Sequence, residues 1–556
     1  MRSLTALGFV GFIALGALIA CDSPYADEPA IDPNAPRLHI TSPDYGTFAG
    51  NVGTVEVKGT VTDDTGVTSV LVNDVTAFVD PDGTFHATVP VVPGTNLLHA
   101  VAKDAQGNTG KETRAVVAGP TETLDRMVPR AITATMSAQT FDAIGRGAAN
   151  FIATADLTSM VQPMNPVVDM GTTNGQPDCL YGQASVTGFD VGSATIRLIP
   201  SSNGLEFSAD LDNVRVDLHL QWAVSCLDGS RNATMTASRV HVAGTFGVSL
   251  DFFGDIQFAL QNPDVTITNF NVDLGGVPGT IVDLLDLDQR MGPVIGWATE
   301  KFVVPMLNKS LAGLNETKTV DLFGKSLDLT VTPTRVETDL SGMLIELDTE
   351  LRAQGDTGEY VLVPNTLPAM DKSQGFQLAI SDDAANQLLT SFWSAKGMDM
   401  AIDLKTGPYG EVGTLYDQVE LTAKVPPYLD ASGEGLKLTV GDLIATFKNG
   451  SAVATRVAVN AQLAIDVTAD PATGALRLDV GTPTTYVDIL DENVDGANAL
   501  SNAQFEAITS FALSRIVAFG SGAIGAIPLP AAGGVAVQNV SVTEQTGYLV
   551  VGGQVQ

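Results

Sequence analysis

The stretch that most constrains this chain runs from residue 276 to 314, and its composition is helical. Its apolar residues recur at helical spacing but go most of the way round, so we expect a helix that is buried or covered. Pro293 and Pro305 cannot continue an unbroken hydrogen-bond ladder, and kinks or breaks are expected there. Because most of the last four-fifths of the chain alternates like β-strand, we predict a long hydrophobic helix wrapped by a curved sheet.

The charge of the chain excludes several classes of partner. Its 556 residues, which suggest about three domains, include 63 acidic and 29 basic ones, for a formal net charge of −34. Nucleic-acid binding needs clustered Lys and Arg, so we expect no nucleic-acid partner. The same charge argues against electrostatic attraction to an anionic membrane surface.

The first residues indicate export. Arg2 is followed by an apolar run to Ala20, and the run ends in Leu-Ile-Ala-Cys at Cys21. This ending resembles a bacterial lipobox, which predicts a signal peptide over residues 1–20 and a lipid anchor on Cys21. An ordinary signal peptide or a membrane anchor is the alternative. The acidic, Pro-rich residues 21–36 then form a tether. The expected location is the bacterial cell envelope, on the outer membrane, facing the periplasm or the surface.

Two further cysteines, Cys179 and Cys226, follow in the chain. Both lie beside strand-like runs, and exported proteins retain disulfides, so we expect the two to pair. A reactive or metal-binding cysteine is the alternative, but no CxxC motif or nearby His supports it.

Residues 37–118 are predicted to form a compact β-sandwich. Strands with clear alternation, such as Thr54–Val61 and Leu98–Ala102, are separated by turn signals such as Asp80–Gly83. The pattern resembles the immunoglobulin-like modules of bacterial surface proteins. Such modules serve as spacers or bind proteins or glycans, and both interpretations stay open.

The remaining chain repeats one plan twice. A helix is expected over Ser137–Val161, followed by long alternating strands and then by the apolar helix of residues 276–314. The second half has strands from Val320, a helix capped by Ser381, more strands, and a helix whose Ser501 starts a capping-box pattern. The repeat indicates two related domains, over residues 128–316 and 317–556.

This order of features resembles the family of bactericidal/permeability-increasing protein, lipopolysaccharide-binding protein and cholesteryl ester transfer protein. The cysteine pair resembles the single disulfide of that family. The strand followed by a helix at Phe376–Leu389 resembles the start of the second domain in that family. Ile527–Pro530 and the strands after it resemble the last segment of the family's chains. The resemblance covers about residues 128–556.

The resemblance implies an α+β, mostly β fold, in which the immunoglobulin-like sandwich is followed by two helix-wrapped, twisted antiparallel barrels in a boomerang. Lipid acyl chains would lie in apolar tunnels between long helices and curved sheets, unless side chains fill the tunnels. The basic tip of the endotoxin-binding members is missing here, so lipopolysaccharide binding does not carry over. The candidate lipid contacts are Phe141, Ile144, Phe151, Ile152, Ile281, Leu284, Leu285, Ile295, Phe302, Leu388, Phe392, Phe505, Ile508, Ile516 and Phe519.

Catalytic motifs are missing from the sequence, so we expect no enzyme and no cofactor, with bound lipid as the cargo. No nucleophile elbow occurs, and no His follows residue 241. Asp491, Asn493 and Asp495 match the start of a calcium loop, but its twelfth position is Asn502 rather than Glu. An acidic turn is the alternative to a calcium site.

The leading hypothesis is a membrane-anchored lipid-binding or lipid-transfer protein whose partners are phospholipid or another apolar lipid and the membrane that holds Cys21. The alternative is a structural or adhesive surface lipoprotein whose immunoglobulin-like domain binds a cell-surface protein or glycan.

Overall fold

The computed structural model describes most of the chain from residue 34 to 555. The described residues are 34–171, 180–225, 227–286, 315, 317–322, 324–353, 355–363, 365–373, 375–406, 409, 412–432, 435–469, 476–481, 483–492, 501, 504–505, 507–512 and 537–555.

The N-terminal domain is a β-sandwich, as the sequence predicts. Apolar side chains alternate along its strands and meet between two sheets, where Val57, Phe85 and Leu98 are fully buried. One sheet has the order β1 (Arg37–Ser42), β3 (Thr54–Thr62), β7 (Thr84–Pro90), β6 (Phe78–Val79). The other has the order β2 (Thr47–Gly50), β9 (Thr109–Ala118), β8 (Gly94–Asp104), β4 (Val67–Val72), β5 (Val75–Thr76).

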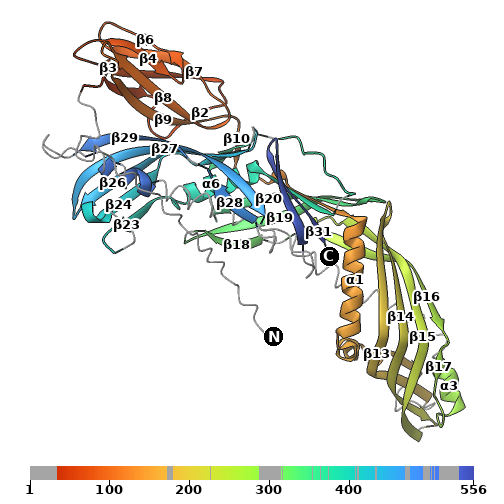
Figure 1. Ribbon diagram of the computed structural model, residues 1–556. Helices are drawn as coiled ribbons and strands as arrows, with labels where there is room; N and C mark the ends of the chain where they lie inside the picture. The colour runs from red at the N-terminus through yellow and green to blue at the C-terminus, as the bar shows by residue number, and fades with distance from the viewer. Residues whose placement is uncertain are drawn as a thin grey trace.

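The second unit is an open, curved half-barrel of very long antiparallel strands, here called the long sheet. Three of its strands have 21 to 24 residues, several times the usual length of about 5–6. Its strands are β12 (Val168–Gly171), β13 (Leu180–Ser201), β14 (Gly204–Val224), β15 (Leu227–Leu250), β16 (Ile256–Thr268) and β17 (Asn271–Val272). Helix α1 (Ala138–Thr154) runs along β13, and α3 (Gly279–Leu285) packs at the far end (Figure 1).

A central sheet joins the two halves of the chain. Strand β11 (Val128–Ser137) lies between β20 (Gly342–Ala353) and β22 (Phe376–Ser381), so the first half contributes its middle strand. The other strands are β18 (Thr317–Leu322), β19 (Lys325–Asp339), β30 (Val537–Gln545) and β31 (Tyr548–Val555). A separate short ladder pairs β10 (Thr121–Thr123) with β21 (Glu359–Val361).

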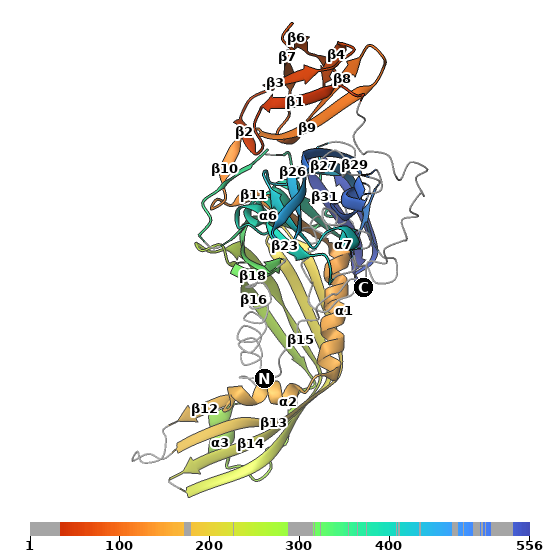
Figure 2. The same ribbon diagram turned by 90° about the vertical axis from the view of Figure 1, so that its left-hand side faces the viewer.

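The second curved sheet lies between the central sheet and the sandwich (Figures 1 and 2). It carries helix α6 (Asp382–Ser394), whose residues from Asp382 to Phe392 are buried. The short helix α7 (Val412–Leu415) precedes β24. The strands are β23 (Met400–Asp403), β24 (Gln418–Ala423), β25 (Tyr428–Asp430), β26 (Leu436–Asn449), β27 (Ala452–Ala469), β28 (Leu476–Val480) and β29 (Thr484–Glu492).

Two helix starts predicted from the sequence are confirmed. The Ser381 side chain accepts a hydrogen bond from the backbone N–H of Asp383 and caps α6. Ser501 and Gln504 form the reciprocal capping box, because the Gln504 side chain accepts from Ser501 N–H and the Ser501 hydroxyl accepts from Gln504 N–H.

Two helices differ from their predicted extents. The helix expected over Ser137–Val161 is divided into α1 and α2 (Leu157–Val161), because Ala155 is extended and Asp156 caps the second piece, which a 3-10 turn follows (Gln162–Met164). In the 276–314 stretch, α3 ends at Leu285, where Asp286 adopts a left-handed conformation. The break therefore comes before either proline, and residues 287–314 lie outside the described part of the chain.

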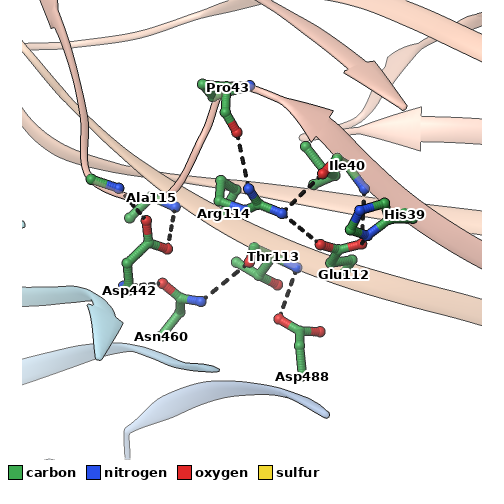
Figure 3. A network of polar contacts seen from close by, with 11 residues as sticks. His39, Ile40, Pro43, Glu112, Thr113, Arg114, Ala115, Asp442, Asn460 and Asp488 are labelled. Carbon is green, nitrogen blue, oxygen red and sulfur yellow. Dashed lines mark hydrogen bonds and ion pairs between the residues drawn. The ribbon is translucent and has the colours of Figure 1, made fainter. Parts of the chain in front are cut away.

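A buried polar network fixes the sandwich to the second curved sheet, and we call it the junction (Figure 3). The backbone N–H of Thr113 donates to Asp488 at 2.9 Å, and that of Ala115 donates to Asp442 at 2.8 Å. Between these two residues, Arg114 forms an ion pair of 2.8 Å with Glu112 inside the sandwich, where both side chains are buried. These bonds join strands more than 300 residues apart in sequence and attach the sandwich directly to the second curved sheet.

Candidate functional site

The long sheet has one apolar face, which we call the inner face. Successive side chains of a strand point to opposite faces, so alternate residues of four strands meet on it. Its residues are Phe189, Val191, Ile196, Leu198, Ala209, Leu211, Val214, Val216, Ala237, Val240, Val242, Val265 and Ile267.

The strand register makes the inner face continuous. Leu211 lies opposite Val240, which in turn lies opposite Ile267 on the next strand. Ala209, Val242 and Val265 form the neighbouring row in the same way. Side chains directly opposite one another are close enough to touch, so these rows form an unbroken apolar surface across β14, β15 and β16.

The outer face of the same strands is polar. Asp212 accepts from the Arg239 guanidinium at 2.7 Å, and His241 lies 2.8 Å from Asp210. The hydrogen bond from Arg239 holds the pKa of the Asp212 carboxyl below its ordinary value. This contrast shows that the curved sheet presents water-facing charges on one side and keeps the other side for apolar contacts.

The inner face connects two packed ends of the long sheet. At the far end, α3 closes a cluster of buried side chains that includes Leu220, Trp222 and Met235. At the central-sheet end, the rings of Phe207 and Phe246 stack with centroids 4.6 Å apart. Phe189, Val216 and Ile267 pack against both clusters but are themselves only half-buried. Between these ends, Val214, Val240 and Val242 are buried, whereas others such as Leu211 and Val265 are half-buried.

Helix α1 borders this face, and small residues set its distance from β13. Gly145 lies so close to the strand that an added Cβ would stand 2.7 Å from the carbonyl oxygen of Ile196. The buried side of α1 consists of Thr140, Phe141, Ala143, Gly145 and Ala149. Of the four candidate lipid contacts on α1, only Phe141 is on this buried side, because close packing on a strand favours small residues over the larger Phe151.

The candidate lipid contacts of the first half fall into different environments. Phe141, Ile281 and Leu285 are buried in the two packed clusters, and Ile144 and Leu284 are half-buried against them. Phe151 is 52% exposed, and its neighbour Ile152 is half-buried. The α1 and α3 residues thus lie toward opposite ends of the inner face, and lipid contact by any of them stays a prediction.

The candidates of the second half pack against other side chains. Leu388, Phe392 and Ile508 are buried in the large core shared by the central and second curved sheets. Phe505 is half-buried. The four candidates Ile295, Phe302, Ile516 and Phe519 lie outside the described residues.

The candidate lipid contacts predicted from the sequence are all helical residues and include none of the inner-face residues on the strands. The strands nevertheless alternate clearly in the sequence, as from Val214 to Leu220. A period of two across four consecutive strands is the signal that identifies them.

The remaining sequence candidates are only partly described. Cys21, Cys179, Cys226, Asn493 and Asp495 lie outside the described residues, and Asp491 is placed only by its backbone pairing with Arg456. Within the described ranges, no cluster of three or more His, Cys, Asp or Glu residues is arranged to hold a metal ion. No helix in the same ranges has the length and apolarity to cross a membrane.

Comparisons with known proteins find similarity to a family over the sandwich and to solved structures over most of the chain. The family model described as glucodextranase, domain B, matches residues 36–119. No curated protein matches the sequence.

Two solved structures are similar to the chain. One is lipopolysaccharide binding protein, with 14% identity over 77% of this chain and 99% of that one, and a TM-score of 0.41. The other is P47 of Clostridium botulinum E1, with 8% identity over 78% of this chain and 100% of that one, and a TM-score of 0.25. At these scores, neither similarity determines what this chain binds.

Proposed function

We propose that this protein is an extracytoplasmic lipid-binding protein and that acyl chains lie along the inner face of the long sheet. The observation that supports this best is the unbroken apolar surface of the inner face, in which rows such as Leu211, Val240 and Ile267 cross three strands between two packed clusters. An apolar surface of this kind, bordered by helices, suits an elongated apolar ligand. The resemblance of residues 128–556 to the lipid-binding family points to the same cargo.

The first experiment is native mass spectrometry of the chain from residue 22 onward, followed by solvent extraction. That chain keeps every described residue. We expect bound masses of one or two lipids per chain that extract as phospholipid or another apolar lipid. An apoprotein mass together with failure to take up added fluorescent lipid would contradict the proposal.

A pair of matched variants locates the cargo. Ala209→Trp adds a large side chain to the inner face, whereas Ala259→Trp adds the same side chain to an exposed position on β16. We expect the first variant to lose at least about tenfold in bound lipid, because the indole occupies the volume of part of an acyl chain. The second variant should carry as much lipid as the unchanged chain. Unchanged lipid content in both variants would place the cargo elsewhere.

The proposal includes attachment to a membrane through a lipid on Cys21. Diacylation of an N-terminal cysteine buries many methylene groups in a bilayer and anchors a protein stably. In metabolic labelling with a palmitate analogue, we expect the unchanged protein to be labelled and Cys21→Ala to be unlabelled. Labelling of the variant would refute the anchor without bearing on lipid cargo.

The second candidate function is adhesion through the sandwich, and the match of residues 36–119 to a domain of glucodextranase favours it. In this case the sandwich would bind a glycan or a cell-surface protein, and the two curved sheets would act as rigid spacers. A glycan array with the chain from residue 22 onward separates the two candidates. Selective glycan binding with no extractable lipid would favour adhesion.

A further inference from the structure

The turn between β15 and β16 exposes two neighbouring aromatic side chains. Phe252 is 95% exposed and Phe253 is 75% exposed, and their rings meet edge to face with centroids 5.5 Å apart. The turn lies beside β19 of the central sheet, since Gly254 approaches Thr332 there. It therefore projects where the long sheet meets the central sheet, at the bend of the molecule (Figures 1 and 2).

The exposed rings are held on a well-bonded turn rather than on a loose loop. One carboxylate oxygen of Asp251 accepts from the backbone N–H of Phe253 at 2.8 Å and of Asp255 at 2.9 Å. The Asn315 side-chain amide donates to the Phe253 carbonyl at 3.0 Å and to the Asp255 carboxylate at 2.8 Å. The backbone of the turn is thus fixed with the rings outward, which lowers the entropy cost of inserting them into a partner.

The size of this patch argues against a protein partner. Two aromatic side chains offer about 300–500 Å² of contact area, whereas a stable protein interface buries about 1,200–2,000 Å² in total. A second copy of this chain would need a much larger apolar surface around the turn, and the neighbours Asp251 and Asp255 are acidic. The interior of a bilayer needs no complementary shape, so two rings are enough for reversible contact.

The charge around the rings selects the kind of membrane. Asp251 and Asp255 flank the turn, and the whole chain carries a formal net charge of −34. Anionic headgroups would repel this surface, whereas zwitterionic headgroups would not.

We propose that the Phe252–Phe253 turn inserts into the surface of a zwitterionic phospholipid bilayer and is the point at which this protein contacts the membrane that exchanges lipid with it. The inference rests on the proposed lipid-binding function and adds a contact site to it. β15 and β16, which the turn connects, also carry Val242 and Val265 of the inner face. Insertion would therefore bring one end of that face to the bilayer.

The test is co-sedimentation of the chain from residue 22 onward with phosphatidylcholine vesicles. We expect binding that Phe252→Ser combined with Phe253→Ser weakens by about a hundredfold, because two phenyl groups stay in water. The control is Phe78→Ser, which removes another exposed phenyl group, 60% exposed, from the sandwich and should bind like the unchanged chain. Vesicles of equal parts phosphatidylcholine and phosphatidylglycerol should bind more weakly.

The outcomes separate this inference from the proposed function. Vesicle binding that survives the double variant, or no binding by the unchanged chain, overturns the contact site, while lipid seen by native mass spectrometry would still support the cargo. A dimer in size-exclusion chromatography that the double variant abolishes would make a second copy the occupant and overturn the membrane contact. Lipid exchange between vesicles should slow at least about tenfold in the double variant, with the bound lipid per chain unchanged.

Discussion

At the residue scale, the junction between the sandwich and the second curved sheet depends strongly on Arg114. Its guanidinium donates to the Ile40 and Pro43 carbonyls and pairs with Glu112, and it lies 3.6 Å from the centre of the Tyr45 ring. A buried cation with these partners neutralises acidic groups that would otherwise stay uncompensated.

The first prediction is that Arg114→Met destabilises the sandwich by about 3–5 kcal/mol, because it leaves the buried Glu112 carboxylate without its cation. Hydrogen exchange of the β9 amides in increasing urea measures this loss. The control is Arg215→Met, whose partner Asp217 is on the exposed outer face of the long sheet, and it should cost less than about 1 kcal/mol. Equal losses would show that the junction gains nothing from burying this pair.

Two carboxylates of the junction give it a pH dependence. Burial raises the pKa of Asp488 to about 7 and that of Asp442 to about 6. Both also face Glu112, which raises these pKa values, and Arg114, which lowers them. Since the folded pKa values exceed the ordinary value near 4, their contribution to stability is fully present below about pH 4 and is lost as the pH rises through about 6–7.

The second prediction follows from that sign. Asp488→Asn keeps an oxygen that can accept from Thr113 N–H but removes the charge, so it should stabilise the protein by roughly 2 kcal/mol at pH 8 and by little at pH 4. Calorimetric melting of both proteins from pH 4 to 8 measures the difference. Asp382 and Asp383 on α6, whose pKa values burial also raises, are present in both proteins and cancel. A difference that does not change with pH would contradict the assignment.

At the element scale, α1 shows how two glycines in one helix can have opposite roles. Gly145 faces β13, where an added Cβ would meet the Ile196 carbonyl oxygen at 2.7 Å. Gly147 has no atom within 4 Å of such a Cβ and is exposed. The difference depends on the position of the strand, so helix propensity alone does not distinguish the two residues.

The third prediction is that the two alanine substitutions change stability in opposite directions. Gly147→Ala should stabilise α1 by about 1 kcal/mol, because alanine is the better helix former. Gly145→Ala should destabilise the packing of α1 on β13 by about 1–3 kcal/mol, because the added methyl group overlaps the strand backbone. Hydrogen exchange of the α1 amides measures both. Stabilisation by both substitutions would show that α1 does not pack this closely on β13.

The elements themselves were largely predictable from local signals. Capping side chains at Ser381 and Ser501 and alternating runs such as the one in β3 identify helix starts and strands, because these signals depend on neighbouring residues. The end of α3 at Asp286 was not predictable in this way. The left-handed conformation of Asp286 depends instead on how α3 packs on the far end of the long sheet, where Leu285 approaches Gly182.

At the scale of the whole molecule, the long sheet is an extended unit joined to the rest mainly at one end (Figure 1). Its far end is held by the cluster around Trp222 and Ile281. Leu180 of β13 pairs with Val224 of β14, and these two residues are close in sequence to Cys179 and Cys226.

The fourth prediction is that Cys179 and Cys226 form a disulfide when the protein folds under oxidising conditions. Intact mass measured before and after reduction should differ by the mass of two hydrogens, about 2 Da, and Cys179→Ser should abolish the difference. Loss of the bond should destabilise the far end of the long sheet by about 2–4 kcal/mol, because the unfolded chain regains the freedom of the loop. Two free thiols in the protein folded under oxidising conditions would contradict the pairing.

The sequence by itself determined the class of each unit. The alternation of apolar and polar residues, together with the turn residues, predicts the sandwich at residues 37–118 and the mostly β character of the rest. The two-residue period of a strand can be read directly from the order of residues. Charge and composition likewise argue against a nucleic-acid partner, which stays a prediction.

Only the tertiary structure decided which units share a sheet and which residues form the candidate site. Strand β11 pairs with β20 and β22, and Thr113 bonds Asp488, across separations that no local pattern encodes. The inner face likewise exists only because the register aligns Leu211, Val240 and Ile267. The physical reason is that these contacts join residues distant in the chain, so their free energy depends on how whole elements pack rather than on local sequence.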